Sequence, residues 1–252
     1  MPRRVCRADW TKSVRFNGTA SKGLITALAL AAKSQVCIDF WMRAEAGGVG
    51  ILFETSSFAA AAGRFTIYYD TGGVNAFLTT TGGSMGYGLM RTVLDRCWHH
   101  VAVVFDCSKS VASGLCVQVY IDGVLSGTIT SQTGTTPANM TTDNVNVGCR
   151  DGVSTFFPGV LKDARVCSFT GSPGATEIGM LYQNVVPSTF TQLNRWLMED
   201  AGATAADSVG SNPIAWTSTT YVSDAPSGGR STASARTTAS ARTTASTRST
   251  AT

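Results

Sequence analysis

The sequence predicts an all-β sandwich of two antiparallel sheets with one short helix, and three observations support this fold class. Apolar side chains alternate with others from Gln35 to Arg43 and from Leu115 to Ile121, the period of strands with one face in a core. Trp98–Phe105 is apolar or aromatic on both faces, which indicates a central strand covered on both sides. Asp122-Gly123 then supplies two residues that tolerate the positive φ of a type I′ hairpin turn.

The remaining elements are short strands separated by Gly-rich or polar turns. Apolar runs and turn residues predict further strands at 13–17, 22–27, 49–55, 64–70, 74–79, 89–93, 124–125, 144–149, 156–169, 192–198 and 214–217. The only helix is predicted from Ala175 to Gln183, after Ser172-Pro173-Gly174. Its Ile178, Leu181 and Tyr182 fall on one face at the helical spacing.

Bulk composition agrees with a globular β-protein. The chain has 252 residues, 43% hydrophobic and 14% charged, with 26 Gly, which suits many strands joined by tight turns. No apolar run reaches the roughly 20 residues that span a bilayer, so no membrane association is expected. The basic start lacks a following apolar stretch, so no secretory signal is predicted.

The positive charge of the chain lies in its last residues. Arg230, Arg236, Arg242 and Arg248 occur at an interval of six in a Ser/Thr/Ala/Arg segment. Without these four, the 20 basic residues become 16, equal to the 16 acidic ones, so the body offers no basic field for nucleic acid. The segment is either a solvated tail or an extended arm whose arginines face one side and act as a tether.

These features divide the chain into an N-terminal arm at 1–12, a sandwich domain at 13–222 and a low-complexity tail at 223–252.

Several motifs then resemble a known superfamily. They are Phe16–Gly18, Ile38–Arg43, Cys97–Asp106, Val119–Val124 and Phe156–Val166, followed by the short helix. Together they resemble the laminin-G-like, concanavalin-A-like lectin/glucanase superfamily in its bacterial and phage branch. The resemblance implies a concanavalin-A-like jelly-roll sandwich. The segment from Trp196 resembles a piece that usually precedes the first strand, so either the order is circularly permuted or this segment adds an edge strand; we favour the second.

The catalytic residues of the glucanase relatives are absent. Those enzymes use a Glu-x-Asp-x-x-Glu strand, and none of the four Glu residues here has that spacing. Gly82–Gly86 matches Gly-x-Ser-x-Gly by letters but lies between strands rather than before a helix. His99 and His100 are adjacent in one strand and point to opposite faces. The sequence therefore predicts no enzyme.

Sugar binding needs an exposed aromatic ring beside polar groups. The candidates are Trp41, Tyr69, Tyr87 and Tyr120, of which Trp41 and Tyr120 fall on the outward face of their strands. The alternative for these rings is ordinary packing, or coverage by another part of the chain.

Members of the superfamily often bind calcium through oxygen atoms of Asp and Asn in rim loops. Asp143, Asn144 and Asp151 are the candidates here, so the expectation for cofactors is none or a calcium ion.

Cysteine usage leaves two alternatives. The seven Cys residues are an odd number and are either reduced and partly buried, or include a Cys107–Cys116 disulfide across a short loop between consecutive strands.

The function predicted from these features is a structural or decoration protein on a virion surface, with tethering termini and other subunits of the assembly as partners. The alternative is a carbohydrate-binding adhesion module with a cell-surface glycan as partner. The expected location is the virion surface or the outside of the cell after release.

Overall fold

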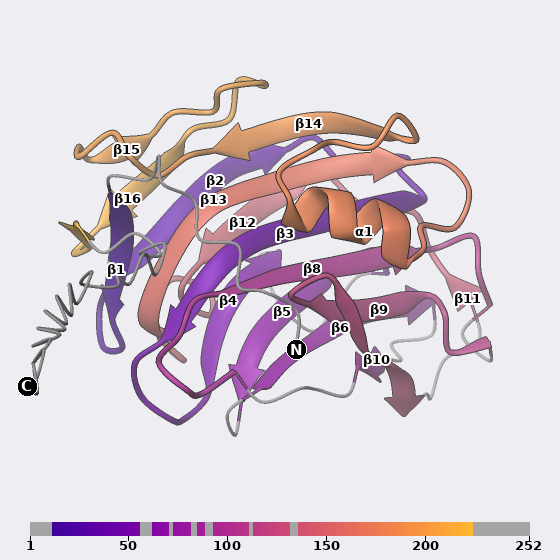
Figure 1. Cartoon of the computed structure of the whole chain (residues 1–252), viewed down its shortest axis with the longest axis horizontal. Coiled ribbons are helices and arrows are strands. Elements are labelled where there is room, and N and C mark those ends of the chain that lie inside the picture. Colours follow the sequence, from indigo (N-terminus) through magenta and orange to yellow (C-terminus); the bar gives the residue numbers. More distant parts are fainter. Residues whose placement is uncertain are drawn as a thin grey trace, which may run out of the picture.

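The structure is a computed structural model that describes residues 12–55, 62–70, 73–81, 85–88, 93–110, 113–131 and 136–223. In these segments the chain forms a sandwich of two antiparallel sheets with one α-helix (Figure 1). Among the residues described, no helix is long and apolar enough to cross a bilayer.

The first sheet is built around β13, which pairs with β3 along one edge and with β1 and then β14 along the other. From β3 the sheet continues through β8 and β9 to the first half of β10, and β17 extends it beyond β1. Its strands are β1 (Ser13–Asn17), β3 (Gln35–Ala44), β8 (His99–Asp106), β9 (Val117–Ile121), β10 (Val124–Ser131), β13 (Pro158–Phe169), β14 (Phe190–Trp196) and β17 (Thr220–Val222).

The second sheet follows the order β15, β16, β2, β12, β4, β5, β6, β7 and ends at the second half of β10. The two sheets therefore share β10. The strands are β15 (Thr204–Ala205), β16 (Ile214–Thr217), β2 (Lys22–Leu28), β12 (Asp143–Val147), β4 (Gly50–Thr55), β5 (Phe65–Asp70), β6 (Gly73–Thr81) and β7 (Met85–Gly88). The short β11 (Thr136–Pro137) pairs with β6.

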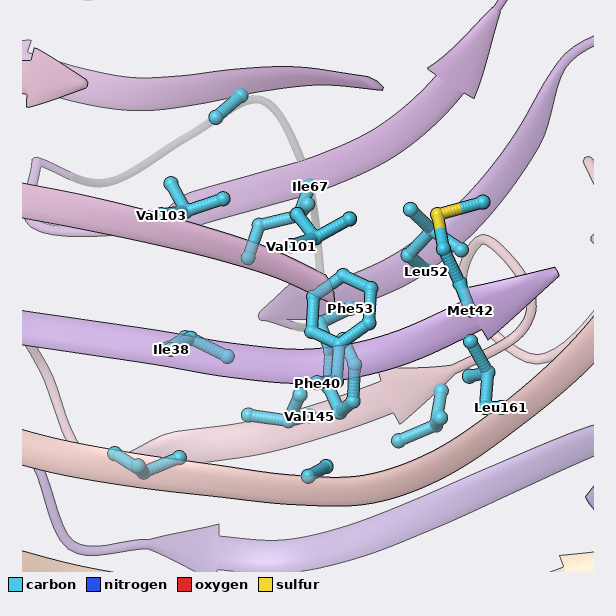
Figure 2. Close-up of a cluster of buried hydrophobic side chains, with 14 of the residues drawn as sticks. Ile38, Phe40, Met42, Leu52, Phe53, Ile67, Val101, Val103, Val145 and Leu161 are labelled. Atoms are coloured by element: carbon cyan, nitrogen blue, oxygen red, sulfur yellow. The ribbon is translucent and has the colours of Figure 1, made fainter. Parts of the chain in front are cut away.

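The core lies between the inner faces of the two sheets (Figure 2). The alternation predicted for β3 is confirmed, because Val36, Ile38, Phe40 and Met42 are all buried in this core. From β8 and β9 the core receives Val101, Val103, Phe105, Val117, Val119 and Ile121. Leu115, predicted to continue this row, precedes β9 and is exposed.

In β4 the period of two is broken, because Leu52 and Phe53 both enter the core. The pairing with β5 shifts between Ile51 and Phe53, and such a bulge turns two consecutive side chains to one face.

The predicted turn is also confirmed. Asp122 and Gly123 have φ angles of 53° and 77°, and the strands they join, β9 and β10, pair directly. The strand that follows the helix, β14, pairs with β13 over 164–169 with a register shift between Val166 and Cys167. The segment from Trp196 onward supplies the two-residue β15, which pairs with β16 in the second sheet.

The helix α1 (Ala175–Tyr182) covers the outer face of the first sheet, as Figure 1 shows. Its Ile178 and Leu181 are buried against Cys37, Ala102, Val104, Tyr120, Cys167, Phe169 and Phe190. The strands β3 and β8 are therefore covered on both faces, as predicted for Trp98–Phe105.

A buried ion pair joins this helix to the sheet. Arg165 donates to Asp39 Oδ1 from Nε (2.9 Å) and Nη2 (2.6 Å), and Nη2 also donates to the carbonyl of Leu181 (2.8 Å). His100 Nε2 lies 3.1 Å from the same Asp39 oxygen. Burial raises the pKa of Asp39, but the Arg165 charge and the His100 hydrogen bond outweigh it, so the pKa lies below its ordinary value. Asp39 is thus ionised at neutral pH and holds the guanidinium that binds the helix.

Replacing one partner of this pair should destabilise the fold strongly. We expect Arg165→Met to lower the free energy of unfolding by about 3–5 kcal/mol, because it leaves a buried carboxylate without its cation. Urea unfolding at pH 7 measures this loss. The double variant Asp39→Leu/Arg165→Met removes both charges and should lose less than Arg165→Met alone; an equal or larger loss would contradict the assignment.

Candidate functional site

The outer face of the second sheet carries a row of polar side chains across adjacent strands. Asn146 of β12 lies opposite Glu54 of β4, and Glu54 lies opposite Thr66 of β5. Their strand neighbours Val145, Phe53, Val147 and Ile67 are in the core. By the alternation of strands, the three polar side chains point away from the core.

Glu54 is fully buried in this row and only one of its oxygens is bonded. Oε2 accepts hydrogen bonds from Arg150 Nε (3.2 Å) and Thr66 Oγ1 (3.3 Å). Within the described part of the chain, Oε1 has no hydrogen-bond partner. Burial raises the pKa of Glu54, Asp151 adds to this, and Arg150 and Thr66 oppose it without cancelling it. A buried acceptor without a donor is costly, which agrees with the raised pKa of this group.

A hollow of about 320 Å³ lies beside this row. It is lined by Lys22, Gly23, Leu24, Asn146, Asp151, Gly152, Ala215 and Thr217. Lys22 Nζ donates to the carbonyl of Gly152 at 2.6 Å, which fixes the turn after β12 against β2. At φ +72° Gly152 has the left-handed backbone that favours glycine.

The lining combines polar groups with a small apolar floor. Asn146 and Asp151 provide an amide and a carboxylate, Lys22 an ammonium group, and Leu24 and Ala215 aliphatic surface. Its volume is at the lower end of the range for small-molecule sites. Such a set can hydrogen-bond several hydroxyl groups while the floor contacts carbon atoms.

Comparison with known proteins identifies the family of this sandwich. The family model described as the concanavalin A-like lectin/glucanases superfamily, of laminin G type, matches residues 17–175. The chain belongs to this superfamily. No curated protein matches the sequence.

Solved structures share the fold at low sequence identity. A proposed carbohydrate binding protein from Bacteroides ovatus ATCC 8483 has a TM-score of 0.58 at 12% identity, covering 85% of this chain and 60% of its own. Domains LG4-5 of the mouse laminin alpha1 chain have a TM-score of 0.50 at 14% identity, covering 84% and 47%. The chain therefore spans 60% and 47% of the lengths of these two structures.

In this concanavalin A-like sandwich, three of the four predicted sugar-stacking rings are buried, so that prediction is wrong for them. Trp41 stacks on Tyr182 of α1 with ring centroids 5.6 Å apart, and Tyr120 packs under the same helix. Tyr69 faces the core and meets Phe157. Tyr87 lies opposite Phe77 in the β6–β7 pair, but its side chain is outside the described part of the structure.

The predicted calcium ligands are not brought together. Asp143 accepts hydrogen bonds from Arg64 Nε (3.1 Å) and Thr141 Oγ1 (2.7 Å), and Asn144 Oδ1 accepts from the Ala27 N–H (2.9 Å). Asp151 follows the other end of β12, whose five residues span about 13 Å. These three residues therefore cannot ligate one ion. Among the residues described, no group of three or more His, Cys, Asp or Glu could hold a metal.

Cys107 and Cys116, the candidate disulfide pair, are both free thiols in the structure. They are close, since the Asp106 N–H donates to the Cys116 carbonyl at 2.9 Å. Burial raises the pKa of Cys107 to about 12, with a contribution from Cys116, and raises that of Cys116 to about 11. Both thiols are therefore protonated and weakly nucleophilic at neutral pH.

The tether arginines Arg230, Arg236, Arg242 and Arg248 lie outside the described residues.

The sequence analysis did not select Glu54 or Lys22. Glu54 is the only charged residue of β4, which marks the outward face of that strand. Lys22 gives no comparable signal, because its role depends on the turn at Gly152, 130 residues away in the chain.

Glu54→Gln should stabilise the fold at pH 7. Because the pKa of Glu54 is raised in the folded state, ionisation of this carboxyl group destabilises the fold. The free energy of unfolding is therefore highest below the pKa that Glu54 has in the unfolded chain, and it falls as pH rises through the pKa of the folded state. Glutamine stays neutral, so we expect a gain of about 0.5–2 kcal/mol, the range of typical stabilising substitutions. Urea unfolding at pH 7 and pH 3 measures it. The gain should disappear at pH 3, where Glu54 is protonated; a less stable variant at pH 7 would contradict the argument.

Proposed function

We propose that the chain is a non-enzymatic carbohydrate-binding module that holds a glycan on the outer face of its second sheet. The observation that carries this proposal is the 320 Å³ hollow, where Asn146, Asp151 and Lys22 surround an apolar floor. Planar amide and carboxylate groups beside aliphatic surface suit a sugar ring, which has hydroxyls at its edge and C–H groups on its faces. The Bacteroides ovatus structure, described as a proposed carbohydrate binding protein, adds support.

The same geometry argues against hydrolysis. Glycosidases need a carboxylic acid that reaches the glycosidic oxygen and a second carboxylate across the bond. Here Glu54 is fully buried and bound to Arg150, so it is not presented to a glycosidic oxygen. We infer that the hollow retains a ligand without cleaving it.

A glycan array on the full-length protein, followed by calorimetry on the best ligand, tests this function. We expect Asn146→Ala to weaken binding about tenfold, the effect of losing one hydrogen bond of roughly 1.4 kcal/mol. Gln192→Ala is the matched control, because it removes a half-buried amide from β14 of the first sheet. Absence of any selective glycan, or equal affinities for wild type and Asn146→Ala, would refute the proposal.

A second candidate function is a structural subunit on a virion surface, found there or outside the cell after release. The observation that favours it is the tail, in which four arginines recur every six residues without any acidic residue after Asp224. In an extended arm these side chains lie on one side and could bind an acidic strip on a neighbouring subunit. The two functions are compatible, since a particle can display a lectin.

Deleting residues 229–252 tests the tether. If the tail joins the protein to an assembly, the shortened chain should co-sediment with particles at a small fraction of the wild-type level. Its glycan affinity should not change, because the hollow lies more than ten residues before the deletion. Equal incorporation of both chains would show that the tail is no tether.

A further inference from the structure

A second hollow of about 350 Å³ lies at a different place, where β3 ends and the chain approaches β8. It is lined by Arg43, Glu45 and Arg96. Arg43 lies near the end of β3, in the first sheet, and Glu45 directly follows that strand, whereas the hollow described above lies on the second sheet. The two are separate sites.

Among the described residues that line this hollow, positive charge exceeds negative charge. Arg15 Nη2 and Arg43 Nη2 both donate to Glu45 Oε1, each at 2.8 Å. One carboxylate is thus shared by two guanidinium groups. The guanidinium of Arg43 also lies 5.6 Å from the ring centroid of Trp98, and its side chain is only 13% exposed. Arg43 is therefore held in one position at the wall of the hollow.

Arg96 adds a third positive charge that no described residue neutralises. It is exposed and has no hydrogen bond or ion pair with the residues described. The neighbouring Asp95 is engaged elsewhere: it accepts from the Cys97 N–H (2.8 Å) and lies 3.0 Å from His99 Nε2. Arg96 has φ +57°, a left-handed conformation that is uncommon for a side chain of this size. Such backbone strain is concentrated at functional positions.

We infer that this hollow binds an oxyanion carried by a ligand, a carboxylate or a phosphate or sulfate ester, between Arg43 and Arg96. The planar guanidinium group presents paired N–H donors that match the oxygens of these anions. Glu45 restricts the ligand, because its carboxylate repels a second anion unless the ligand places a hydrogen-bond donor between the two groups. The best ligand therefore carries a hydroxyl group next to its anionic group. This inference goes beyond the proposed function, which concerns the other hollow and requires no charge on the ligand.

Calorimetry on the full-length protein at low ionic strength tests the site with four probes: glucuronic acid, glucose 6-phosphate, inorganic phosphate and glucose. We expect the two anionic sugars to bind and to shift the indole N–H resonance of Trp98, while glucose leaves this resonance unchanged. Arg96→Gln should weaken the anionic sugars tenfold or more, since a charged bidentate contact is lost. The tail is present in every variant and cannot account for a difference between them.

Lys109→Gln is the matched control. It also removes one positive charge, but Lys109 follows β8 whereas Arg96 precedes it, about 25 Å away along eight residues. Arg96→Gly serves as a second variant. It removes the guanidinium group, and glycine adopts the left-handed backbone of this position without strain, so the variant should fold. Asn146→Ala should leave the anion affinity unchanged, which separates this site from the proposed glycan site.

If Arg96→Gln and Lys109→Gln weaken the binding of the anionic sugars equally, the loss is explained by the net charge of the protein alone, and the inference is overturned. Absence of binding by all three anions would overturn it as well. Inorganic phosphate that binds as tightly as both sugars would show that the hollow holds a bare ion rather than part of a ligand, and would also overturn it.

Discussion

The ion pair between Asp39 and Arg165 determines which surfaces of the sandwich remain open. Arg165 bonds the sheet through Asp39 and the helix through the Leu181 carbonyl, and this polar contact acts together with the apolar packing of Ile178 and Leu181 to hold α1 in place. Because α1 covers the middle of the first sheet, the outer faces of β3 and β8 are closed to ligands. The two hollows lie elsewhere, one on the second sheet and one beside the end of β3.

Much of the fold follows from local features of the sequence. The alternation in β3 and β9, the two-sided apolar run of β8 and the Asp122-Gly123 turn each depend on neighbouring residues. The facing of the side chains in β4 depends instead on how that strand pairs with its neighbour. The bulge that turns Leu52 and Phe53 to the same face arises from the pairing of β4 with β5. Neither residue type predicts it.

The candidate site was harder to predict than the fold. Alternation correctly assigned Trp41 and Tyr120 to the outer face of a sheet, but it cannot say what covers that face. Here a helix more than 50 residues further along the chain covers it. Conversely, Lys22 and Asn146 meet only because β2 and β12 pair across more than a hundred residues. Sites assembled from such distant strands leave no spacing motif for a single sequence to reveal.

The pairing of β1 with β17 has a mechanical consequence. Ser13 lies opposite Val222, so the first and last strands of the sandwich run side by side and the domain is entered and left at one corner. A unit of this kind can be inserted into a loop of another polypeptide with little distortion. A force applied to the two ends of the domain would break the hydrogen bonds between β1 and β17 one after another. The rest of the sandwich would unfold only after these two strands had separated.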